Sequence, residues 1–156
     1  MVEERIAWLK MTANQSPRRM ITIGFIIAGC VNFFGSLLVS AGFTNRLLAS
    51  LDPVVFSNFG LVAIMLWGLA YIAVSRSYQF VPYVVIVFVL EKLVYTVVWV
   101  AWLFRSGHQL RGLFSEAPLT ATFFSTYGLV DFSFGVFFAW VAARTLRQRS
   151  SFQPGV

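Results

Sequence analysis

Residues 81–104 read VPYVVIVFVLEKLVYTVVWVAWLF, a stretch in which an acid and a base, Glu91 and Lys92, stand in the middle of an otherwise uncharged run. A helix over this stretch would be about 36 Å long at about 1.5 Å per residue, enough to cross a hydrocarbon core of about 30 Å. The stretch therefore predicts a membrane-spanning helix with two charged side chains near mid-depth.

The rest of the chain agrees with a membrane setting. Of its 156 residues, 58% are hydrophobic and only 12% are charged, with a mean hydropathy of +0.77. A soluble domain of this size needs more charge on its surface. Each apolar run begins at or just after a proline, where a helix tolerates the missing N–H. We expect an all-α integral membrane protein, a single domain with a bundle of four transmembrane helices. The four runs are 20–43, 54–74, 81–104 and 121–143.

The flanks of the runs predict the orientation. Eight basic residues lie in the N-terminal flank, the connection between the second and third runs, and the C-terminal flank. Three lie in the first and third connections. Because basic residues gather on the cytoplasmic side, both termini are expected to be cytoplasmic. The same bias explains the net charge of +6, so no nucleic-acid partner is expected. Val2, Ile6 and Leu9 recur at helical spacing, which predicts a short amphipathic N-terminal helix in the interface. Trp99 and Trp102 are expected as interfacial anchors.

Three of the four runs place a strongly polar residue at similar depth. Asn32, Glu91 and Asp131 each lie about 15–18 Å from the start of their run at the helical rise. In the first run, small and polar residues recur every four positions around Asn32, a surface that lets another helix approach closely. The sequence therefore predicts one polar layer near the membrane midplane, facing protein. The repeating residues are Gly24, Ala28, Asn32, Ser36 and Ser40.

The charges in this layer do not balance. Lys92 can offset one carboxylate, whereas Glu91 and Asp131 are two. Since an isolated charge at this depth costs about 2.5–3.5 kcal/mol or more, either one carboxyl group carries a proton, or the layer holds water, a cation or a cationic ligand. This predicts a pocket for a lipophilic small molecule, with Glu91 and Asp131 as proton donor and acceptor. The residues expected to contact the ligand are Asn32, Trp67, Lys92, Tyr95 and Tyr127.

Two other functions stay open. The layer can instead serve to fix packing in a non-catalytic subunit or assembly factor of a larger membrane complex. It can also belong to a proton-linked small transporter working as an oligomer, such as a homodimer. Because Glu91 and Lys92 are sequence neighbours, about 100° apart around a helix, they are not expected to point to one spot. The single histidine, His108, and single cysteine, Cys30, give no metal-binding spacing, and no motif names a cofactor. The lipid bilayer is the expected surrounding.

Overall fold

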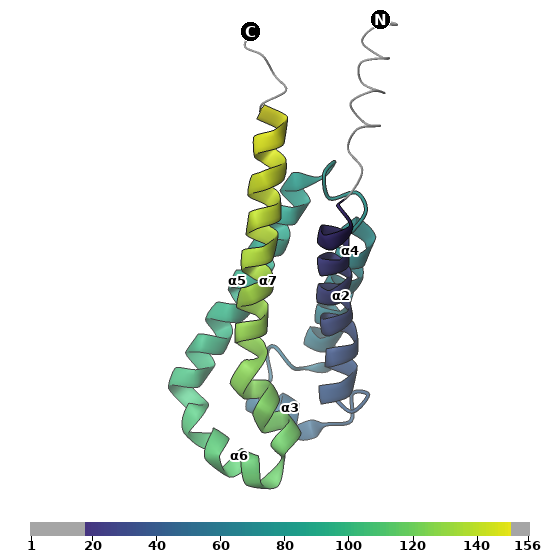
Figure 1. The fold of residues 1–156 in the computed structure, drawn as a ribbon. Helices are drawn as coiled ribbons and strands as arrows, with labels where there is room; N and C mark the ends of the chain where they lie inside the picture. Colours follow the sequence, from purple (N-terminus) through teal and green to yellow (C-terminus); the bar gives the residue numbers. More distant parts are fainter. Residues whose placement is uncertain (1–17, 151–156) are drawn as a thin grey trace, which may run out of the picture.

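The computed structural model describes residues 18–150, which form helices joined by short turns (Figure 1). The predicted amphipathic N-terminal helix lies outside these residues. The four long helices run along one another, and two short helices lie at the end of the molecule away from the start of α2. The helices are α2 (Arg19–Val39), α3 (Arg46–Leu51), α4 (Asn58–Val74), α5 (Pro82–Ser106), α6 (Leu110–Glu116) and α7 (Pro118–Ser150), with a 3-10 turn at Gly107–Gln109. The all-α prediction is confirmed.

Three of these segments are long and apolar enough to cross a membrane. They are α2, the segment beginning with α5, and α7, and only 33%, 28% and 28% of the residues in their apolar stretches are buried inside the molecule. Most of each apolar surface therefore faces outward, where lipid is the solvent that accepts it. The fourth apolar helix, α4, has 17 residues and spans about 26 Å at the helical rise. Length and composition thus indicate a multi-pass membrane location.

The first predicted run was too long. Helix α2 ends at Val39, and Ala41, Gly42 and Phe43 have positive φ angles of 47°, 64° and 72°. The turn supplies partners for carbonyl oxygens that the helix end leaves open: the Gly42 N–H donates to the Leu37 oxygen at 3.0 Å, and Asn45 Nδ2 donates to the Val39 oxygen at 2.9 Å. Such local bonds stop a helix even inside an apolar run.

The second predicted run began too early. Helix α4 starts at Asn58, and Ser57 is its N-cap, accepting from the Gly60 N–H at 3.1 Å. The carboxylate of Asp52 instead accepts from the N–H groups of Val54 and Val55, at 3.2 and 3.0 Å, and holds a turn. An aspartate that bonds the backbone two and three residues on competes with helix formation.

The prolines mark two helix starts as expected, since Pro82 begins α5 and Pro118 begins α7. Helix α7 continues to Ser150, beyond the predicted end at 143, and its last turns carry basic residues that suit a helix C-terminus. Arg149 there donates to the Gln79 oxygen at 2.8 Å, so the extension contacts the connection between α4 and α5.

The helices pack as two pairs, α2 with α4 and α5 with α7. The predicted protein-facing ladder of α2 is confirmed for Ala28, Asn32, Ser36 and Ser40, which are buried. The closest backbone approach lies beside it: a Cβ on Gly29 would collide with the Gly68 oxygen, and a Cβ on Gly68 would lie 2.7 Å from the Gly29 oxygen. Glycine at both positions lets the two helices meet at this distance.

The prediction of interfacial anchors at Trp99 and Trp102 was wrong. Both side chains are buried between helices. Trp99 Nε1 donates to the Phe124 oxygen at 2.8 Å, and Trp102 Nε1 donates to the Leu51 oxygen at 3.0 Å. A buried indole requires such a partner for its N–H, and these two carbonyl oxygens provide it.

Candidate functional site

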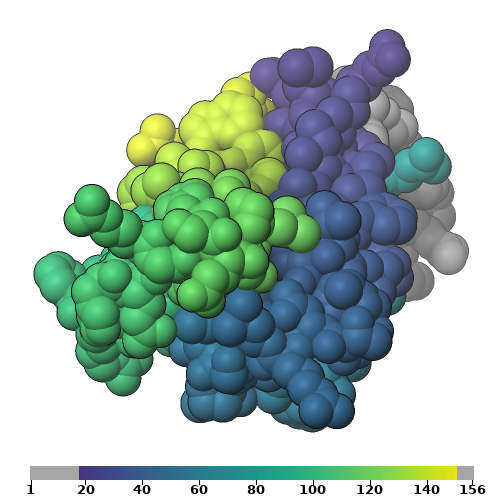
Figure 2. Space-filling view, turned by 90° about the horizontal axis from the view of Figure 1, so that it is seen from below, coloured from purple at the N-terminus to yellow at the C-terminus, as the bar shows by residue number. Residues whose placement is uncertain are grey.

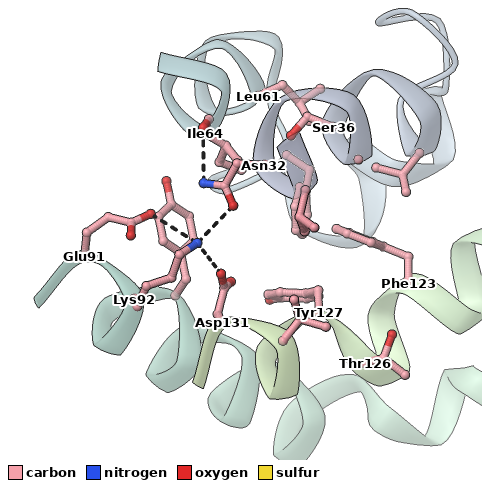
Figure 3. A pocket seen from close by; sticks show the side chains of 16 residues that line it. Asn32, Ser36, Leu61, Ile64, Glu91, Lys92, Phe123, Thr126, Tyr127 and Asp131 are labelled. Carbon is pink, nitrogen blue, oxygen red and sulfur yellow. Dashed lines mark hydrogen bonds and ion pairs between the residues drawn. The ribbon is translucent and has the colours of Figure 1, made fainter. Parts of the chain in front are cut away.

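Lys92 lies at the centre of the predicted polar layer. Its ammonium group lies 2.5 Å from Asp131 Oδ1 on α7 and donates to Asn32 Oδ1 on α2 at 3.0 Å. It also lies 3.8 Å from Glu91 Oε1, so the prediction that Glu91 and Lys92 cannot meet at one spot was wrong. The long, flexible lysine side chain reaches back to its neighbour's carboxylate despite the angle between the two Cα–Cβ bonds. Figure 3 shows the three contacts converging on the ammonium nitrogen.

The second carboxylate, that of Glu91 on α5, is held by a side chain of α4. The hydroxyl of Tyr71 donates to Glu91 Oε2, while Glu91 Oε1 accepts no hydrogen bond within residues 18–150. Tyr71 is fully buried, and its ring packs against Phe88 and Phe138, with centroids 4.8 and 4.9 Å apart. Because these rings fix the phenol, Glu91 is held in place by a donor that did not figure among the predicted site residues.

Asn32 joins the two helix pairs. Its Nδ2 donates to the Ile64 oxygen of α4 at 3.3 Å, and its Oδ1 accepts from Lys92. The amide therefore presents its oxygen to the cation and its N–H₂ to a backbone carbonyl. All four long helices contribute to the cluster, whereas the sequence pattern had indicated three.

A pocket of about 170 Å³ adjoins this cluster. The polar residues Asn32, Glu91, Lys92 and Asp131 line part of it, and the other walls are largely apolar or aromatic. Figure 3 shows Phe123 and Tyr127 across an open space from Asn32 and Ser36. The remaining lining residues are Val31, Gly35, Val39, Phe56, Leu61, Ile64, Tyr95, Thr126 and Val130.

The side of the pocket between α2 and α7 is accessible from outside. Val31 on α2 is 41% exposed, Val130 on α7 is 39% exposed, and Thr126 is exposed as well. Since these residues belong to helices that are apolar enough to span a membrane, the opening would face lipid rather than water. Seen from below, the surfaces of α7 and α2 lie directly beside each other (Figure 2).

Of the seven predicted site residues, six line the pocket and one does not. Asn32, Glu91, Lys92, Tyr95, Tyr127 and Asp131 surround it. Trp67 instead packs against Phe88 beside the cluster, with ring centroids 6.2 Å apart, and does not line the pocket. Tyr71 was missed, although a tyrosine in a helix with no charged residue was a usable signal. The described residues contain no group of three or more potential metal ligands.

These features define a helical protein with candidate membrane spans and a buried Glu91–Lys92–Asp131 cluster. Comparison with protein-family models, with curated proteins and with solved structures found no match for this chain.

Proposed function

We propose that this chain is a four-span membrane protein with both termini on the cytoplasmic side, and that its pocket binds a lipophilic small molecule. Glu91 and Asp131 act as proton donor and acceptor toward that molecule. The observation that supports this most is the pocket itself, which touches both carboxylates and is otherwise largely apolar. A cluster that served only to fix helix packing would need no such space beside it.

The size of the pocket limits what it holds. A protein cavity of about 150 Å³ accommodates a benzene ring. The present pocket, at about 170 Å³, suits a head group of similar size, and a longer apolar tail would extend through the opening between α2 and α7. The ligand would therefore enter sideways from the bilayer, with its polar end at the cluster.

The charge of the cluster supports a role in proton transfer. Of the charged residues in the described part of the chain, only two carboxylates and one ammonium group line the pocket. An uncompensated negative charge at this depth is costly, so the empty site would hold one proton on a carboxyl group. Such a proton lies where a ligand can take it up, because the Asp131 side chain is 15% exposed.

Blocking the opening is expected to remove the ligand. Val130→Trp places a bulky ring at the mouth, and the purified variant should lose the lipophile that the unaltered protein retains at about one molecule per chain. Val136→Trp is the matched control, because Val136 lies on the same helix, is 54% exposed and does not line the pocket. Mass spectrometry of the extracted small molecules measures the difference. An unaltered protein that carries no lipophile, or equal retention in both variants, would contradict the proposal.

The topology predicts labelling from opposite sides. In a Cys30→Ser background, Ser150→Cys should react with an impermeant maleimide only after cell lysis, whereas Gly112→Cys should react on intact cells. Both positions are exposed: Gly112 lies on α6, just before the start of α7, and Ser150 is the last residue of α7, at the other end of the molecule (Figure 1). Reaction of Ser150→Cys on intact cells would place the C-terminus outside.

A further inference from the structure

We infer that the ligand of this pocket is a lipophilic amine, bound as its ammonium form beside Asp131. This inference rests on the proposed function, since it names the class of molecule that the pocket would take. It combines three observations: an unequal charge count, an accessible carboxylate oxygen and an aromatic wall on the same cavity.

The first observation is that the carboxyl groups lining the pocket outnumber the cations by one. Lys92 is the only cation among the lining residues, and it serves both carboxylates, at 2.5 Å from Asp131 and 3.8 Å from Glu91. Tyr71 gives Glu91 a hydrogen bond but no charge. A ligand with one positive charge would neutralise the cluster with both carboxyl groups ionised, whereas beside a neutral ligand one carboxyl group would keep its proton.

The second observation concerns which carboxylate a ligand can reach. Only 5% of the Glu91 side chain is exposed, whereas 15% of the Asp131 side chain is exposed. Asp131 uses Oδ1 for Lys92, and its Oδ2 has no hydrogen-bond partner within residues 18–150. In Figure 3 the Asp131 carboxylate lies at the border of the open space, while Glu91 lies on the far side of Lys92. The ammonium group would therefore bond Asp131 Oδ2.

The third observation is a cluster of three rings along the same cavity. Phe56, Phe123 and Tyr127 all line it, and their centroids lie 5.1–5.3 Å apart. The faces of aromatic rings attract cations, especially where water is excluded. The Tyr127 hydroxyl is buried without a hydrogen-bond partner among the described residues, so it supplies an acceptor for an ammonium N–H.

These observations define a simple acid–base step. A neutral amine partitions from the bilayer through the opening between α2 and α7. Its nitrogen lone pair takes the proton of the carboxyl group, which forms an ammonium–carboxylate pair and leaves the total charge of the complex unchanged. When the amine leaves as the neutral base, the proton returns to the carboxylate.

The test compares two probes of equal length, dodecylamine and dodecanol, on the full chain in nanodiscs of neutral lipid. Native mass spectrometry measures how much of each probe binds. The amine should bind about tenfold more tightly than the alcohol, because a charge-assisted hydrogen bond is about twice as strong as a neutral one. In Asp131→Asn this preference should fall to about twofold or less. Phe123→Leu, which removes one ring and keeps the carboxylate, should weaken amine binding several-fold and leave alcohol binding nearly unchanged.

The outcomes separate the two proposals. Equal binding of amine and alcohol to the unaltered protein would overturn the ammonium inference and leave a pocket for neutral lipophiles. An amine preference that persists unchanged in Asp131→Asn would overturn the assignment to Asp131. If Asp131→Asn does not fold, the Phe123→Leu variant provides the test. Equal weakening of amine binding and alcohol binding in that variant would overturn the inference. If neither the amine nor the alcohol binds, the proposed function is overturned as well.

Discussion

Lys92→Met is expected to destabilise the protein by about 3–5 kcal/mol, the cost typical of removing one partner from a buried ion pair. The Lys92 side chain is 2% exposed, and within residues 18–150 it is the sole cation in contact with Glu91 and Asp131. Methionine fills a volume similar to that of lysine. The loss of stability would therefore come from the missing positive charge rather than from a cavity. The variant leaves Glu91 and Asp131 without their counter-charge in an apolar interior, and Asn32 loses the donor to its Oδ1.

A double variant distinguishes charge from shape. Lys92→Met with Asp131→Asn should recover much of the lost stability, because it removes one of the two carboxyl groups that lost their counter-charge. Asp131→Asn alone should be mild, since it leaves one carboxyl group for one ammonium group and keeps an oxygen for Lys92. Thermal unfolding in one detergent, followed by circular dichroism, measures all three. If Lys92→Met melts like the unaltered protein, Lys92 does not serve as the shared counter-charge.

Gly128→Leu is the second substitution with a large expected effect. A Cβ at this position would already overlap the indole ring of Trp99. The ring cannot move aside easily, because it is buried and its N–H is bonded to the Phe124 oxygen at 2.8 Å. Overpacking a rigid core typically costs about 1–3 kcal/mol of stability. A leucine at position 128 would cost more than an alanine, because it adds a larger side chain to the same space. The variant should separate α5 from α7 and lower the melting temperature strongly.

A graded series and a glycine control make this test specific. Gly128→Ala should be destabilising, but less so than Gly128→Leu. Gly112→Ala, where nothing lies within 4 Å of the added Cβ, should be neutral or stabilising by up to about 1 kcal/mol, since alanine favours the helix. Equal melting temperatures for Gly128→Leu and the unaltered protein would mean that the helix pair packs differently around Trp99.

The grouping of Asn32, Glu91 and Asp131 was predictable, because depth along a helix follows from residue number alone. Asn32, Glu91 and Asp131 were predicted at one level from a constant rise per residue, and all three lie around the Lys92 ammonium group or its pocket. The helix ends at Val39 and Asn58 were missed, since they depend on hydrogen bonds made by Asn45, Asp52 and Ser57. An apolar run does not reveal such bonds.

By itself, the sequence determined the all-α class, the candidate membrane spans and the unequal charge count of the layer, because these depend on composition and on the fixed geometry of one helix. The tertiary structure decided which side chains meet. Lys92 lies closer to Asp131 than to Glu91, Tyr71 donates to Glu91, and Trp67 lies away from the pocket. These contacts depend on how helices are rotated and how closely they approach, for example at Gly29 and Gly68. Rotation and approach are set by packing between distant residues, which no single stretch of the chain encodes.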